Sequence, residues 1–174
     1  MLKWLWLSGF VIALDQLTKL LANTRLEAYQ PVPVLPLFNL TLMYNEGAAF
    51  SFLGDAGGWQ RWLFTLLAIG ISIFIVIWLR RLSPTKKWEA AGLSLVLGGA
   101  IGNVIDRLWH GHVIDFLDFY YRAESCLPLF VRIGRNGGEC HWPAFNLADS
   151  AITVGVVLLL FDTLRAHRET PASA

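Results

Sequence analysis

Two aspartates have the residue type and the setting for acid–base chemistry. Asp149 lies three residues after Asn146, in the first turn of a long apolar run, and Asp115 lies in the stretch HVIDF. When two carboxylates share a site, one keeps a proton and polarises a carbonyl while the other activates water. The pair therefore predicts hydrolysis of a peptide bond, provided that the fold brings the two residues together.

Each aspartate also has a plainer interpretation. Asp149 can be the third residue of a capping box whose N-cap is Asn146, with its charge favoured by the helix dipole. Asp115 can be grouped with His110 and His112 as a metal site, but no further ligand has convincing spacing for zinc. Two cysteines are too few for a zinc cluster. We therefore predict no metal, and the capping alternative stays open.

The composition indicates the environment in which these carboxylates lie. Of the 174 residues, 55% are hydrophobic and only 16% are charged, whereas a soluble domain has nearer a quarter charged residues. The eight Trp and eleven Phe suit a membrane interface. The net charge of +1 leaves no basic stripe for a nucleic acid. The composition predicts an integral membrane protein with little mass outside the bilayer.

Four apolar segments are long enough, or nearly so, to cross roughly 30 Å of hydrocarbon, which takes about 20 residues. Backbone amides cannot stay unpaired in lipid, so the segments are helices. The predicted fold class is an all-α membrane protein with four transmembrane helices. The helices cover about 4–22, 62–79, 88–105 and 147–164, in a single domain over 1–166, and 167–174 form a disordered tail.

Basic residues give the predicted orientation. The connection 80–87, RRLSPTKK, has four basic residues and no acidic one, and short loops of this kind stay cytoplasmic. Both termini are then cytoplasmic, and the long connections 23–61 and 106–146 face outward. The first helix is retained and not cleaved as a signal peptide, because it carries Asp15 and Lys19 and no clean cleavage site follows it.

This topology gathers polar residues at one outer level. Charges inside a membrane cost about 2.5 to 3.5 kcal/mol each, so they rarely occur without a role or a partner. Asp15 and Lys19, four residues apart, can be a structural ion pair, and Asp106 is interpreted as a solvated helix end. The residues at this level are Asp15, Lys19, Asn103, Asp106, Arg107, Asp115 and Asp149.

The two outer connections carry strand patterns. VLPLFNLTLMY alternates in part between apolar and polar residues and leads to Asn45 and Gly47, which supply turn chemistry. A small extracytoplasmic β element is therefore predicted between the first two helices, with Asn45 either a turn residue or a site residue. Between Cys126 and Cys140, alternating apolar residues run into GRNGG, which predicts a hairpin. Because disulfides persist in an oxidising compartment, we predict that these two cysteines pair.

Five ordered motifs closely resemble those of lipoprotein signal peptidase (bacterial signal peptidase II), and they run through nearly the whole chain. The motifs are DQLTK at 15–19, YNEGAAFSFL at 44–53, GGAIGNVIDR at 98–107, GHVIDF at 111–116 and PAFNLADSAIT at 143–153. That family is a four-helix aspartyl protease of the bacterial cytoplasmic (inner) membrane. The resemblance implies removal of the signal peptide from diacylglyceryl-modified prolipoproteins, just before the lipidated cysteine.

By this resemblance the catalytic pair falls on Asp115 and Asp149. The family positions that line or organise the site are matched by Asp15, Lys19, Asn45, Asn103, Arg107 and Asn146. The resemblance also implies an enzyme without a cofactor, a monomer surrounded by membrane lipid with its active site on the extracytoplasmic side, and inhibition by globomycin-type cyclic peptides. The segment 122–140, which carries both cysteines, is longer than the family pattern and is the main departure from it.

The competing interpretation is a non-enzymatic membrane protein. A small transporter would use Asp15, Lys19 and Asp149 as a proton or ion path. Such transporters usually draw on internal repeats, and the sequence contains none. The sequence therefore favours the protease.

Overall fold

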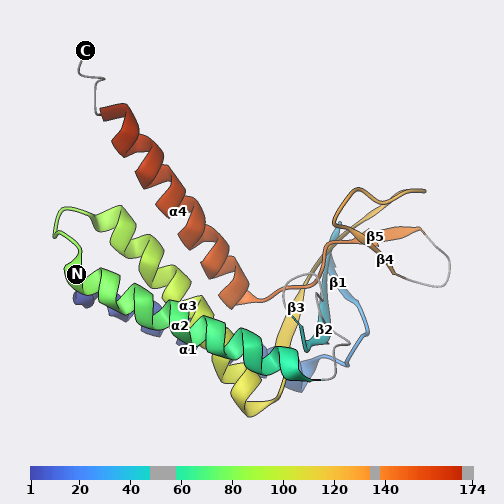
Figure 1. The fold of residues 1–174 in the computed structure, drawn as a ribbon. Helices are drawn as coiled ribbons and strands as arrows, with labels where there is room; N and C mark the ends of the chain where they lie inside the picture. The colour runs from blue at the N-terminus through green and yellow to red at the C-terminus, as the bar shows by residue number, and fades with distance from the viewer. Residues whose placement is uncertain (48–57, 134–137, 170–174) are drawn as a thin grey trace. The chain divides into compact units, whose positions relative to one another are not determined.

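The structure is a computed structural model that describes residues 1–47, 58–133 and 138–169. Its elements follow one another in the order shown in Figure 1. They are a 3-10 helix η1 (Leu2–Trp4), α1 (Leu5–Arg25), β1 (Val32–Leu35), β2 (Phe38–Asn45), α2 (Trp59–Arg81), α3 (Lys87–Trp109), β3 (Val113–Arg122), β4 (Val131–Ile133), β5 (Glu139–His141) and α4 (Leu147–Glu169).

The four helices predicted from the apolar segments are all present. Each is long and apolar enough to cross a membrane. The helices run a few residues past the predicted ends, because polar residues beyond an apolar run can continue a helix in water or headgroups. One consequence is that α4 continues to Glu169, so residues 167–169 are helical where a disordered tail was predicted. The rest of that tail, 170–174, lies outside the described residues.

The chain divides into two compact units. Unit 1 comprises Met1–Asp15, Leu67–Val104 and Leu147–Ala174, and unit 2 comprises Gln16–Leu66 and Ile105–Asn146. The division runs through α1, α2 and α3, so each of these helices contributes to both units. The single domain over 1–166 stays a prediction.

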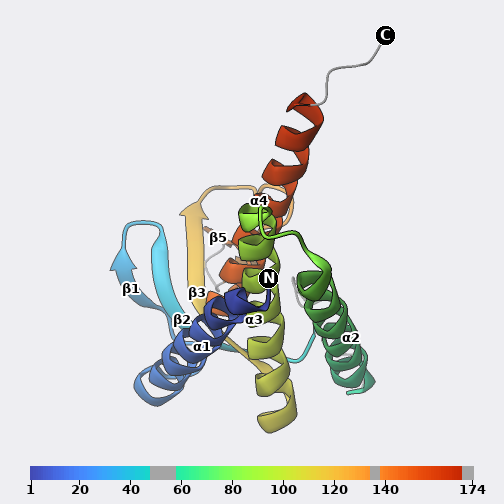
Figure 2. The ribbon, with the colours of Figure 1, turned by 90° about the vertical axis from the view of Figure 1, so that its left-hand side faces the viewer.

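In unit 1, small residues let α3 approach its neighbours closely. A Cβ on Gly98 would lie 3.0 Å from the carbonyl oxygen of Ser8 in α1, and one on Gly92 would lie 2.9 Å from that of Gly155 in α4. Ser8 Oγ also donates to the carbonyl of Ser94 at 2.7 Å. Figure 2 shows the N-terminal part of α1 next to α3. Close backbone approach of this kind is how helices pack where lipid removes the hydrophobic driving force.

Among the described residues of unit 2, five antiparallel strands form one sheet in the order β1-β2-β3-β5-β4. Strand β3 is central, and Met43 pairs with Asp115 in its register with β2. The predicted β element between the first two helices corresponds to β1 and β2. The predicted hairpin between the cysteines corresponds to β4 and β5, although its turn, 134–137, lies outside the described residues. Strand β3 was not predicted, because its first residues are buried on both faces and do not alternate.

Candidate active site

Asp115 lies on β3 in unit 2, and both of its carboxylate oxygens are held by asparagine amides. Asn45 Nδ2 donates to Oδ2 at 3.0 Å, and Asn146 Nδ2 donates to Oδ1 at 2.8 Å. Asn146 also donates to the carbonyl of Ile114 at 3.3 Å. Asp115 is only 2% exposed and Asn146 is fully buried. The carboxylate is therefore fixed in orientation from both sides by neutral donors.

Asn45 is both a turn residue and a hydrogen-bond donor to Asp115. Its Oδ1 accepts a hydrogen bond from the backbone N–H of Gly47 at 3.0 Å, which is the Asx turn expected after a strand. The turn orients the amide so that Nδ2 faces Asp115. The interpretation of Asn45 as a turn residue is confirmed. Its role as a site residue stays a prediction, to which the hydrogen bond with Asp115 lends support. The rest of the YNEGAAFSFL motif, from residue 48, lies outside the described residues.

Arg107 and Lys19 support the same region of unit 2 from the helices. Arg107 is buried, its Nη2 donates to the carbonyl of Gly47 at 3.1 Å, and its guanidinium lies 5.7 Å from the ring centre of Phe64. It therefore holds the turn that orients Asn45. Lys19 forms an ion pair with Asp106, with Nζ 2.8 Å from Oδ2.

The interpretation of Asp106 as a solvated helix end is wrong. Asp106 is 1% exposed, and α3 continues beyond it to Trp109. Its carboxylate accepts hydrogen bonds from Gln16 Nε2 at 2.9 Å and from the backbone N–H of Ile114 at 3.1 Å, in addition to the Lys19 ion pair. Asp106 thus fixes the start of β3, one residue before Asp115.

Asp149 lies in the first turn of α4 in unit 1, and it is half-buried. Asn103 Nδ2, from α3, donates to its Oδ1 at 2.8 Å. The backbone N–H of the preceding residue, Ala148, is satisfied by Asp15, whose Oδ1 accepts it at 2.9 Å. Asp15 is fully buried, and a Cβ on Gly102 would lie 2.6 Å from its Oδ2. A carboxylate from α1 therefore caps the start of α4 and sets the position of Asp149.

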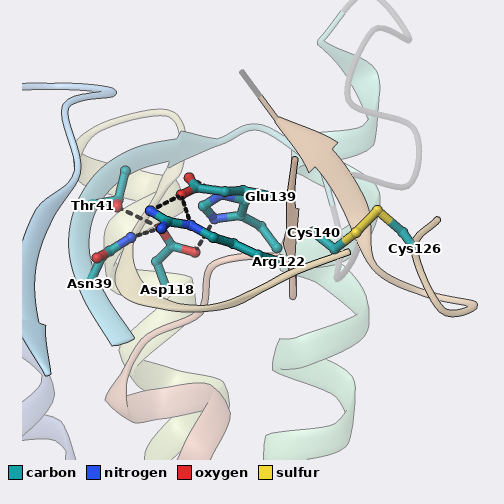
Figure 3. A network of polar contacts seen from close by, with 8 residues as sticks. Asn39, Thr41, Asp118, Arg122, Cys126, Glu139 and Cys140 are labelled. Carbon is teal, nitrogen blue, oxygen red and sulfur yellow. Dashed lines mark hydrogen bonds and ion pairs between the residues drawn. A yellow bond between two sulfur atoms is a disulfide. The ribbon is translucent and has the colours of Figure 1, made fainter. Parts of the chain in front are cut away.

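A second buried network of hydrogen bonds in unit 2 was not predicted from the sequence (Figure 3). Asp118 Oδ1 lies 2.7 Å from His141 Nδ1, and its Oδ2 accepts hydrogen bonds from Thr41 Oγ1 at 2.7 Å and Asn39 Nδ2 at 3.5 Å. All four residues are buried. The network joins β2, β3 and β5 beside a cavity of about 220 Å³ that Asp115 also lines. The polar residues in these segments are visible in the sequence, but only the strand register shows that they contact one another.

The disulfide between Cys126 and Cys140 is present in the structure (Figure 3). Cys140 is fully buried on β5, directly before His141. The bridge therefore ties the long segment after β3 to the strand that carries the Asp118 partner. For the residues that the structure describes, no three His, Cys, Asp or Glu side chains converge as metal ligands would.

The chain is similar to known proteins over nearly its whole length. A family model described as "Signal peptidase (SPase) II" matches residues 7–165. A lipoprotein signal peptidase of Shewanella pealeana is 45% identical over 173 residues, which is 99% of this chain and 92% of the relative. One from Pseudomonas aeruginosa is 47% identical over 173 residues, 99% of this chain and 94% of the relative.

A solved structure agrees with this assignment. A bacterial membrane enzyme solved by the in meso method at 2.3 Å resolution has a TM-score of 0.77 at 28% identity, covering 99% of this chain and 93% of that one. A second bacterial membrane enzyme, at 1.9 Å resolution, has a TM-score of 0.71 at 29% identity, covering 93% of this chain and 92% of that one. The family match, the curated relatives and the fold lead to one conclusion: the chain belongs to the signal peptidase II family.

Proposed function

We propose that this protein is a membrane-embedded aspartic endopeptidase with Asp115 and Asp149 as its catalytic pair. It removes the signal peptide from diacylglyceryl-modified prolipoproteins, cleaving before the lipidated cysteine. The family membership and the relatives named lipoprotein signal peptidase support the reaction. The four apolar helices agree with a multi-pass protein of the bacterial membrane.

The contacts of the buried aspartates support the choice of this pair. Asp106 is bound to the ammonium group of Lys19, and Asp118 is bound to His141. Asp115 and Asp149 each accept a hydrogen bond from an asparagine amide. An amide N–H donor fixes the orientation of a carboxylate. The orientation of these two carboxylates by asparagine amides is the single observation that carries the assignment.

The reaction follows from two carboxylates that share one proton. The ionised carboxylate accepts a proton from a water molecule, which attacks the scissile carbonyl, while the protonated carboxylate donates a hydrogen bond to the carbonyl oxygen. The tetrahedral intermediate collapses when the leaving amine takes up a proton and the C–N bond breaks. The asparagines and Asp15 act as positioning residues, because they hold the two carboxylates or the helix that carries one of them.

The orientation is part of the same proposal. The basic connection RRLSPTKK keeps the middle loop and both termini cytoplasmic. The motifs that carry the two aspartates then face the extracytoplasmic side, where the lipidated cysteine of the substrate lies at the membrane surface. We propose a monomer within membrane lipid that works without a cofactor, and that cyclic peptides of the globomycin type compete with the substrate.

The test compares prolipoprotein cleavage by Asp115→Asn, Asp149→Asn and the double variant. General acid–base steps contribute about 100- to 10,000-fold each, so each single variant should lose at least about 100-fold in rate. The double variant should be hardly slower than either single one, because residues that act as a unit are not additive. The capping interpretation of Asp149 instead predicts a loss of about 1 kcal/mol in stability with cleavage largely intact.

Asp162→Asn is the matched control. Asp162 lies on α4 and is 3.6 Å from Lys86 in a partly exposed ion pair, so its substitution should leave cleavage unchanged. Asp106→Asn cannot serve, because Asp106 is buried in an ion pair. Rapid cleavage by folded Asp115→Asn or Asp149→Asn protein would end the proposal.

A further inference from the structure

Unit 2 has another cavity, of about 280 Å³, lined by residues that the proposed reaction does not use. Arg61 and Trp62 line it from the first turn of α2, and His110 and His112 line it from the segment between α3 and β3. Glu46 supplies a carboxylate to the same cavity. Three side chains that can carry positive charge therefore meet around a space large enough for a small anionic group.

Arg61 makes few polar contacts for a half-buried guanidinium. Its Nη2 lies 3.5 Å from the carbonyl oxygen of Leu108, at the limit of a hydrogen bond, and its Cζ lies 4.9 Å from the ring centre of Trp62. Its Nε is buried without a hydrogen-bond partner among the described residues. A guanidinium presents five N–H donors in a planar fork that fits a phosphate. Its donors are thus available to a ligand with several acceptor oxygens.

The two histidines can add positive charge to the cavity when they are protonated. Their rings stack with centres 6.1 Å apart. Burial, followed by repulsion from His110, lowers the pKa of His112, and Arg61 acts in the same direction, while Asp106 and Glu46 oppose the shift. When both imidazoles are neutral, Glu46 balances Arg61. A bound anion would favour the protonated imidazoles, so anion binding and proton uptake at this cavity are coupled.

The surroundings indicate where the anion comes from. Trp59 and Trp62, at the start of α2, are 53% and 54% exposed, and Trp109, at the end of α3, is 82% exposed. These are the ends of two helices long and apolar enough to cross a membrane. Exposed Trp rings at helix ends mark the level of the lipid headgroups. The oxygen-rich anion abundant at that level is the phosphate of a phospholipid.

We propose that Arg61, His110 and His112 bind the phosphate group of a phospholipid headgroup. Arg61 donates hydrogen bonds from its guanidinium to the phosphate oxygens, and a protonated imidazole adds a charge-assisted hydrogen bond. Trp62 packs beside the guanidinium and covers it on one side. The lipid chains lie along the exposed apolar side chains of α2, which include Leu63, Leu66 and Leu67.

Native mass spectrometry of the full-length protein in detergent tests the site, with short-chain phosphatidylglycerol as the probe. Arg61→Gln should weaken binding about tenfold or more, since it removes the charge-assisted hydrogen bonds. Arg25→Gln is the matched control, because Arg25 is an exposed arginine at the end of α1, and it should bind as the wild type does. Equal binding by wild type and Arg61→Gln would overturn the proposal.

Two further probes separate the sources of phosphate. Diacylglycerol, which lacks the phosphate, should not compete with phosphatidylglycerol, and inorganic phosphate should compete only weakly. Competition by diacylglycerol at equal concentration would refute phosphate recognition. Inorganic phosphate that binds as tightly as the lipid would assign the cavity to the free anion and would refute the lipid proposal.

A measurement on the wild-type protein does not depend on how a variant folds. NMR of histidine-labelled protein should show that phosphatidylglycerol raises the pKa of His112, and lipid binding should be several-fold tighter at pH 6 than at pH 8. An unchanged His112 titration, with binding independent of pH, would contradict the coupling and with it the site. Neither readout uses prolipoprotein cleavage, so the result is separate from the test of the catalytic pair.

Discussion

Replacement of Lys19 by methionine should destabilise the protein far more than the loss of a surface charge would. Lys19 and Asp106 are both about 1% exposed, and their ion pair has an N–O distance of 2.8 Å. Lys19→Met keeps a long unbranched side chain, one atom shorter, but leaves the Asp106 carboxylate buried without this ammonium group. Both residues lie in helices that can span a membrane, where water cannot replace the lost partner.

The size of the effect follows from the contacts that remain. Removing one partner of a buried ion pair costs about 3 to 5 kcal/mol. Gln16 Nε2 at 2.9 Å and the Ile114 N–H at 3.1 Å still donate to Asp106 in the variant. These neutral donors place the expected cost near the lower limit, at about 3 kcal/mol. For a chain of this size that corresponds to a fall in melting temperature of about 6 to 12 °C.

Adding Asp106→Asn to Lys19→Met should restore most of this loss. The asparagine nearly preserves the volume and removes the buried charge, so we expect recovery of about 2 kcal/mol, within the usual range of coupling between contacting residues. Unfolding is followed by circular dichroism in mixed detergent micelles for all variants. Lys86→Met is the control, because Lys86 is 45% exposed and lies 3.6 Å and 3.9 Å from its two acidic partners; it should lose less than about 1 kcal/mol.

Two results would refute this reasoning. The first is a Lys19→Met protein as stable as Lys86→Met, which would mean that the buried carboxylate finds another partner at little cost. The second is a double variant no more stable than Lys19→Met alone. That result would mean that Lys19 contributes through packing of its side chain and not through its charge.

Three further predictions concern the loop, the helix packing and pH. The Cys126–Cys140 bridge, with a sequence separation of 14, should contribute about 3 kcal/mol; alkylation under denaturing, non-reducing conditions should label neither cysteine, and full labelling would contradict the bridge. Gly99→Ala should lower the free energy of unfolding by about 1 to 3 kcal/mol, since its Cβ would lie 2.3 Å from a backbone carbonyl oxygen. Gly9→Ala is the control and should be tolerated, because nothing lies within 4 Å of its Cβ. Thermal unfolding of both variants tests this prediction. Burial and then His110 lower the pKa of His112. As the pH falls below about 6.5, the imidazole of the unfolded state therefore takes up a proton before that of the folded state. The free energy of unfolding should fall with pH in the wild type and fall less in His112→Gln, and identical pH profiles would disprove this.

The helices and the cysteine hairpin were predictable because their signals are local. A membrane span is defined by the length of an apolar run, so the four helices followed from the segments around Trp4, Trp62, Trp88 and Leu147 with errors of a few residues. The β4–β5 hairpin followed from alternation and a glycine-rich turn. The candidate catalytic residues came from motifs whose order and spacing resemble a known family, which a single short pattern would not have provided.

The partners of the buried polar residues were not predictable from the sequence, because they depend on how the helices are rotated and how closely they approach. Asp15 binds the N–H of Ala148, 133 positions away, and this is possible only because Gly102 leaves room for the carboxylate. Asp106 reads as a solvated helix end in the sequence, yet in the structure it is buried in an ion pair with Lys19.

The sequence by itself therefore determined the number of helices, the hairpin with its two cysteines and the family. Those features depend on the periodicity of short segments and on the order of motifs along the chain, and both can be recognised without knowing which residues are in contact. Only the tertiary structure decided that asparagines hold Asp115 and Asp149, whereas Lys19 binds Asp106 and His141 binds Asp118. The physical reason is that a charge in a membrane protein must find its partner in space, and helix packing and strand register decide which distant residue that partner is.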